Sequence, residues 1–269
     1  MELDNLLDQR RNQEQRLYRL ELLRDGFDQD IRVQREEIDL LLDEESPEQF
    51  DVAQQYNAAL HTLDTFGYSG ELTPAYENLQ DACEQASEQI QSLRRPRLLL
   101  VPNVSFASML RAIERARRSK KFTANDLYFN EQMYGVPREQ WLKQLDDPNF
   151  QEDEFIFYYP YVVEGAKQAP LTADDQDQSL SKRIAKIKST RPQGMQGMTR
   201  KIYAHLAMHH LAEGKPLDRR TWTIFDGDEA QKKMIPRASC THGPTFACIG
   251  CDDVLTTARF RSVIPMVAL

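Results

Sequence analysis

The sequence predicts an α+β protein with a helical N-terminal region followed by a mixed domain. Apolar residues recur at steps of three and four between Leu17 and Leu93, the period of helices that bury one side. The composition changes at Pro96, where proline stops the helix and an apolar run begins. We therefore expect an antiparallel helical bundle or coiled coil over residues 1–94 and an α+β domain over residues 98–269.

The helical region divides at turn signals. Ser46-Pro47 provides a cap and a proline suited to the first helical turn, Gly67 breaks the pattern, and Thr73-Pro74 restarts it. An apolar stripe needs a partner, either another helix of the same chain or a helix of a second chain. We therefore expect a spacer or a homo-oligomerisation arm. Cys83 lies within this pattern, and we expect it to be a small buried apolar residue.

The second region mixes strand and helix signals. Ser105 caps a helix, Gly214 ends another at its C′ position, and Glu164 to Gln178 read as an exposed loop. The expected elements, in order, are a buried strand at 98–101, a helix after residue 105, a strand at 154–163, a short helix at 180–188 and an amphipathic helix at 198–211.

Composition limits the function. The chain has 269 residues, 28% of them charged, and a net charge of -8, which disfavours general binding to duplex DNA. It contains no apolar run of about 18 residues, and Met1 to Asn5 lack the features of a signal peptide. We expect a cytoplasmic protein that does not enter a membrane.

Two clusters of ionisable residues have plain explanations. A basic run follows Ser105 and could meet nucleic acid, although a solvated helix face beside an acidic region is the interpretation we favour. Its residues are Arg111, Arg115, Arg117, Arg118, Lys120 and Lys121. His209 and His210 are adjacent, so on a helix they point about 100° apart and do not readily share one metal ion. We read them as packing and surface residues.

Four segments carry a family resemblance. They are Leu99–Leu110, Met198–Asp218, Trp222–Gly227 and Ala258–Val263. Their order and C-terminal position resemble target proteins of diversity-generating retroelements, specifically those whose variable domain has the C-type-lectin fold related to formylglycine-generating enzyme. The likeness covers residues 98–269, apart from the loop at 164–178.

The resemblance implies a non-enzymatic recognition protein with a changeable surface at residues 238–257, here called the recognition segment. Such a surface needs a rigid frame on both sides, and the expected scaffold anchors are Trp222, Phe225, Arg259 and Arg261. The expected ligand is a protein or another macromolecule, without a cofactor or metal. The expected ligand-binding residues are Ser239, Cys240, Thr241, His242, Thr245, Ala247, Ile249, Cys251, Asp252 and Asp253.

A zinc site competes with this interpretation. Cys240, His242, Cys248 and Cys251 supply the ligand types of a closed tetrahedral site. The protein would then be a zinc-stabilised interaction or nucleic-acid adaptor, with these four residues as fixed scaffold.

Catalysis finds less support. The sequence contains no Gly-rich phosphate loop, no Gly-x-Ser-x-Gly turn and no His-Glu-x-x-His helix. A clustered cysteine acting as nucleophile with His242 as base is the one catalytic arrangement left open. We predict that the protein is not an enzyme.

Overall fold

A computed structural model describes residues 50–68, 72–119, 155–165, 178–214, 217–225, 234–240, 244–250, 252 and 258–266. The chain divides into two compact units, residues 1–49 and 50–269, and everything described belongs to the second. Most of the predicted N-terminal arm therefore lies outside the described residues.

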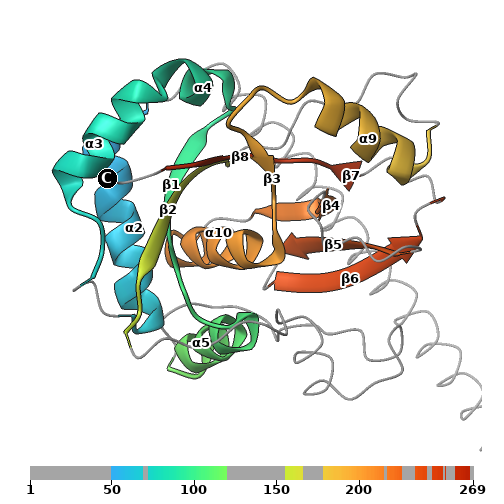
Figure 1. Cartoon of the computed structure of the whole chain (residues 1–269). Coiled ribbons are helices and arrows are strands. Elements are labelled where there is room, and N and C mark those ends of the chain that lie inside the picture. The colour runs from blue at the N-terminus through green and yellow to red at the C-terminus, as the bar shows by residue number, and fades with distance from the viewer. Residues whose placement is uncertain are drawn as a thin grey trace, which may run out of the picture. The chain divides into compact units, whose positions relative to one another are not determined.

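The second unit mixes helices and strands, which confirms the predicted α+β class (Figure 1). Its elements are α2 (Val52–Phe66), α3 (Tyr76–Gln85), α4 (Ser87–Ser92), β1 (Pro96–Pro102), α5 (Phe106–Arg118), β2 (Tyr158–Glu164), α9 (Leu180–Thr190), β3 (Gln196–Gly197), α10 (Arg200–Ala212), β4 (Asp218–Ile224), β5 (Met234–Cys240), β6 (Pro244–Gly250), β7 (Ala258–Arg259) and β8 (Ser262–Pro265).

The strands form two four-stranded sheets. The first has the order β1-β2-β8-β3 with antiparallel pairs throughout, and its β1–β2 register runs from Pro96 opposite Glu164 to Pro102 opposite Tyr158. The second has the order β6-β5-β4-β7, in which only the β4–β7 pair is parallel. The C-terminal strand β8 thus lies inside the first sheet, between β2 and β3.

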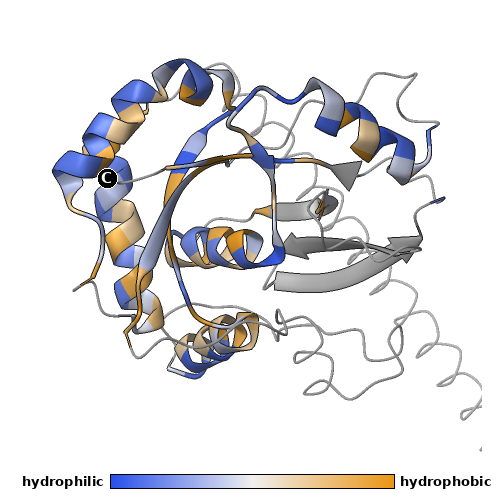
Figure 2. Cartoon of the chain, viewed as in Figure 1, coloured by the Kyte–Doolittle hydropathy of each residue, from blue (hydrophilic) through white to orange (hydrophobic). Residues whose placement is uncertain are grey.

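Helices pack on both faces of the first sheet, which explains why every residue of β1 is buried. Successive side chains of a strand point to opposite faces. Leu98 and Leu100 join the core formed with α2, α3 and α4, whereas Leu99 and Val101 join the core formed with α5 and α10. Figure 2 shows apolar residues along these strands and mixed polar and apolar residues on the helices around them.

The position of α2 to α4 bears on the predicted domain boundary. The boundary between residues 94 and 98 falls at the connection from α4 to β1. Ala59 of α2, together with Leu79 and Cys83 of α3, nevertheless shares a core with the strands. Within the described residues these helices cover the sheet, and the division of the chain into compact units comes earlier, after residue 49.

The predicted amphipathic character of residues 198–211 is wrong. In α10, all ten residues from Ile202 to Leu211 are buried, because the helix contacts α2, α5, β1 and β5. A helix that is enclosed on all sides has no polar face toward solvent. The spacing of its apolar residues therefore does not indicate which side is buried. Like the other helices in the described ranges, it does not combine the length and apolar composition needed to cross a membrane.

The predicted ends of several elements are confirmed. Ser105 Oγ accepts a hydrogen bond from the Ser108 backbone at the start of α5, as an N-cap residue does. Gly67 and Gly214 follow α2 and α10 in the left-handed conformation, with φ of 77° and 68°, where glycine has no Cβ to clash. The two glycines therefore set the directions in which the chain leaves α2 and α10.

Candidate recognition site

The predicted recognition segment lies in an excursion of the chain between two strands, β4 and β7, that pair with each other. Strand β4 ends at Ile224, and β7 begins at Ala258. The two strands pair in parallel, with Trp222 opposite Ala258 and Thr223 opposite Arg259. The strands that flank residues 226–257 therefore lie beside each other, and we call this pair of strands, β4 and β7, the stem.

Arg261 ties this stem to the first sheet. Its side chain is 1% exposed. Nε donates to Thr223 Oγ1 of β4 over 3.0 Å, and Nη1 donates to the Glu164 backbone carbonyl at the end of β2 over 2.8 Å. The backbone N–H of Ser262 donates to Glu164 Oε2 over 3.4 Å. Hydrogen bonds to a charged guanidinium are stronger than neutral ones, so Arg261 fixes β4, β2 and the start of β8 relative to one another.

Apolar contacts hold both ends of the stem. Phe225 is buried in the main core and meets Tyr203 of α10 edge-on, with ring centroids 5.8 Å apart. Ile224 and Phe260 form a smaller cluster with Leu180 of α9, against which Trp222 packs. The Arg183 guanidinium lies 5.5 Å from the centroid of the Phe260 ring, a cation–π distance. The stem is therefore held by packing as well as by Arg261.

The remaining predicted anchor, Arg259, lies in β7 opposite Thr223. Its side chain is outside the described part of the structure. Arg259 and Arg261 do not share one strand, because β7 ends at Arg259 and β8 begins at Ser262.

Strands β5 and β6 form an antiparallel hairpin that carries five of the predicted ligand-binding residues (Figure 1). Ser239 and Cys240 lie at the end of β5, and Thr245, Ala247 and Ile249 follow at alternate positions of β6. Ser239 lies opposite Thr245. Asp252 is exposed, whereas Thr241, His242, Cys251 and Asp253 lie outside the described residues.

The hairpin register bears on the zinc hypothesis. Cys240 lies opposite Pro244, and Cys248 lies opposite Pro236, four residues before Cys240. At about 3.4 Å per residue, the two cysteines lie about 13 Å apart along the hairpin. Two sulfurs bound to one zinc ion lie within about 5 Å of each other, and a cysteine side chain is too short to close that gap. The register therefore counts against one ion held by both Cys240 and Cys248.

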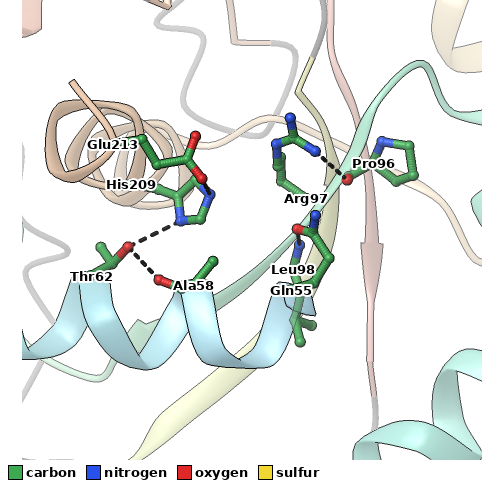
Figure 3. A network of polar contacts seen from close by, with 8 residues as sticks. All are labelled: Gln55, Ala58, Thr62, Pro96, Arg97, Leu98, His209 and Glu213. Carbon is green, nitrogen blue, oxygen red and sulfur yellow. Dashed lines mark hydrogen bonds and ion pairs between the residues drawn. The ribbon is translucent and has the colours of Figure 1, made fainter. Parts of the chain in front are cut away.

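Three buried histidines on α10 form a polar cluster inside the fold. His205 and His209 are fully buried, and His210 is 8% exposed. The expectation that the pair His209 and His210 includes a surface residue is wrong, because α10 is enclosed and both are buried. In Figure 3, His209 lies between Thr62 of α2 and Glu213. Nδ1 is 3.0 Å from Thr62 Oγ1, and Nε2 is 3.4 Å from Glu213 Oε1.

The Thr62 contact assigns the tautomer of His209. The Thr62 hydroxyl donates its one hydrogen to the Ala58 carbonyl over 2.9 Å, so Nδ1 of His209 must donate to Thr62 Oγ1. His205 and His210 differ from His209, since neither ring makes a hydrogen bond to another of the described residues. Burial, and then the charge of His209, lowers the pKa of His205 to about 3. The same two causes, followed by Arg261, lower the pKa of His210 well below its usual value.

This histidine cluster does not form a metal centre. Within the described residues no group of three or more His, Cys, Asp and Glu side chains is arranged to hold an ion. His205 and His209 are four residues apart, so the sequence places them on one side of a helix. Their burial follows from the packing of α10, which the sequence does not show.

The described basic side chains of α5 face the solvent. Arg111, Arg115 and Arg118 are exposed, and Ala112, Ile113 and Ala116 of the same helix are buried. Lys120 and Lys121, as well as the side chain of Arg117, lie outside the described part. The observed face is consistent with a solvated helix surface.

Comparisons of the chain with known protein families, curated proteins and solved structures found no match.

Proposed function

We propose that this is a non-enzymatic recognition protein whose residues 238–257 form a changeable ligand-binding surface on a C-type-lectin-like scaffold. A surface that must accept different side chains needs a frame whose stability does not depend on them. The proposal places the protein among the targets of diversity-generating retroelements, which the four motif segments resemble.

The observation that carries the proposal is the closed stem. Trp222 pairs with Ala258 and Thr223 with Arg259, and Arg261 links Thr223 to the carbonyl of Glu164. The stem contacts are made by residues that flank residues 226–257, and β5 within this stretch also pairs with β4 and contacts α10. Side-chain substitutions within residues 226–257 would leave the stem contacts in place, which is the property a variable surface requires.

The most direct test of the family assignment is genomic. The gene is expected to lie near a reverse transcriptase gene, with a near-duplicate of the region encoding residues 230–260 beside it. The two copies are expected to differ mainly at adenines of the duplicate. A complete genomic neighbourhood with neither element would remove the retroelement part of the proposal and leave the recognition role to be tested separately.

Metal content separates this proposal from a zinc-stabilised adaptor. Protein purified without added metal is expected to contain zinc well below one equivalent per chain. Near-stoichiometric zinc, lost when Cys248 is replaced by serine, would make the Cys240, His242, Cys248 and Cys251 group a scaffold. Salt-dependent binding of DNA or RNA would support the adaptor role.

The proposal extends to assembly. Residues 1–49 carry an apolar stripe, and we propose that the N-terminal helices associate with those of other copies in the cytoplasm. Several recognition segments on one oligomer would strengthen weak individual contacts through avidity. Sedimentation of the full chain against a chain beginning at residue 50 tests this, and an equal number of chains per particle would contradict it.

A further inference from the structure

An open groove is lined by residues that all lie outside the β5–β6 hairpin. It runs between the connection from α2 to α3, the first half of β2 and the end of β8, and has a volume of about 520 Å³. We call it the aromatic groove. Its lining residues are Leu72, Thr73, Pro74, Asn78, Phe157, Tyr158, Tyr159, Pro160, Tyr161, Pro265 and Met266.

Large apolar side chains are exposed at this groove. Leu72, Phe157 and Tyr159 expose 44%, 47% and 54% of their surface, and Phe155 and Ile156 continue the exposed run beyond the lining. A fully exposed aromatic side chain presents about 150–250 Å², so the three lining residues Leu72, Phe157 and Tyr159 together expose roughly 300 Å². An apolar patch of that size on a monomer often marks a binding site.

The exposed area helps to identify the occupant. A stable interface with a second protein buries about 800 Å² on each partner, more than twice what this patch presents. A second copy of the chain held through the patch alone would therefore bind poorly. A short peptide segment that lies along the groove needs no more area than the groove provides.

The chemistry of the lining residues further limits the class of ligand that the groove can bind. None of the lining residues carries a formal charge, so the groove does not complement a phosphate, a lipid headgroup or a charged peptide. Its walls combine aromatic rings with prolines. Burial raises the pKa of Tyr161 above its usual value, so this hydroxyl stays protonated and can donate a hydrogen bond.

We infer that the aromatic groove binds an uncharged, proline-rich peptide segment of a partner protein in the polyproline II conformation. Such a segment has no internal hydrogen bonds, so its carbonyls accept from donors such as the tyrosine hydroxyls of Tyr159 and Tyr161. Its pyrrolidine rings pack against aromatic walls, and its prior stiffness reduces the entropy lost on binding. An amphipathic helix would instead need a continuous apolar channel for side chains on successive turns. This second binding surface is independent of the recognition segment.

The test measures binding of a fluorescein-labelled decaproline peptide to the full chain by fluorescence anisotropy. A labelled Gly-Ser repeat of equal length and an amphipathic Leu-Lys helical peptide are the comparison probes. Decaproline is expected to bind at least about tenfold more tightly than either one, with little dependence on salt. Equal binding of decaproline and the Gly-Ser peptide, or tighter binding of the helical peptide, would overturn the inference.

Variants locate the binding site. Tyr159→Ala is expected to weaken decaproline binding by at least about tenfold, because it removes an aromatic wall. Phe155→Ala is the matched control, since Phe155 is even more exposed, at 59%, but does not line the groove. Leu72→Ser alters a lining residue from the connection between α2 and α3 and is expected to act like Tyr159→Ala. Equal loss in the Phe155 control, or a Tyr159 variant that changes only self-association, would contradict the assignment.

Discussion

Arg261 donates a hydrogen bond to the backbone carbonyl of Glu164 over 2.8 Å, joining the C-terminal end of the stem to the end of β2. The same guanidinium reaches Thr223 in β4. Residues from two strands, β2 of the first sheet and β4 of the second, thus meet at one buried side chain. The sheets hold together at the base of the proposed recognition surface, where a variable segment most needs support.

Replacing Arg261 by methionine is expected to lower the free energy of unfolding by about 3 kcal/mol. The substitution leaves the buried acceptors on Glu164 and Thr223 without their donor. Arg111→Met on the exposed face of α5 is the control and is expected to change stability by less than about 0.5 kcal/mol. Urea unfolding measures both, and similar losses for the two variants would contradict the role given to Arg261.

Stability is expected to fall in acid because of the buried histidines of α10. Burial and the charge of His209 lower the pKa of His205 in the folded state to about 3, so the folded protein favours the neutral ring. The contribution is fully present above the unfolded pKa of about 6.5 and is lost as the pH falls toward 3, by up to about 1.4 kcal/mol per pH unit.

His205→Leu tests this explanation. The variant is expected to show a shallower loss of stability between pH 6.5 and 4 than the parent, because one group that gains a proton on unfolding is gone. The readout is the free energy of unfolding from urea titrations at several pH values. A pH dependence identical to the parent's would rule out His205 as a source of the acid sensitivity.

Cys83 is expected to resist alkylation in the folded protein. Burial raises the pKa of its thiol to about 11, which reduces the thiolate present at pH 8 by at least about a hundredfold. Mass spectrometry of the Cys83 peptide after iodoacetamide treatment measures the rate, with urea-unfolded protein as the reference. Native and unfolded rates within a factor of about ten would show that the thiol is accessible.

Gly214→Ala is expected to cost about 1 kcal/mol of unfolding free energy. Gly214 has a φ of 68°, and a Cβ added there would meet no atom within 4 Å, so the cost comes from backbone strain alone. Gly214→Asn is expected to cost less, since asparagine tolerates this conformation better. Equal thermal stability of Gly214→Ala and the parent would argue against this strain.

Short-range signals in the sequence predict much of this fold. The helix stops at Gly67 and Gly214 and the cap at Ser105 are local backbone requirements, so residue type alone reveals them. The enclosure of α10 is different, because it arises from contacts with elements distant in the chain. His205 and His210 therefore look polar in the sequence and are buried in the fold.

The candidate site divides in the same way. The anchors Phe225 and Arg261 are apolar or arginine residues beside strand signals, and both are buried at the stem. The partners of Arg261 could not be predicted, because Glu164 lies almost a hundred residues earlier in the chain. The aromatic groove was also missed, since its walls come from three segments that only the folded chain brings together.

The central claim is that the frame, and not the recognition segment, carries the stability. The decisive measurement is the unfolding free energy of a variant that combines Ser239→Tyr, Thr245→Asn, Ala247→Asp and Ile249→Ser, set against Phe260→Ala in the stem. We predict a change within about 1 kcal/mol for the combined variant and a loss of about 3–5 kcal/mol for Phe260→Ala. A combined variant as unstable as Phe260→Ala would contradict the claim.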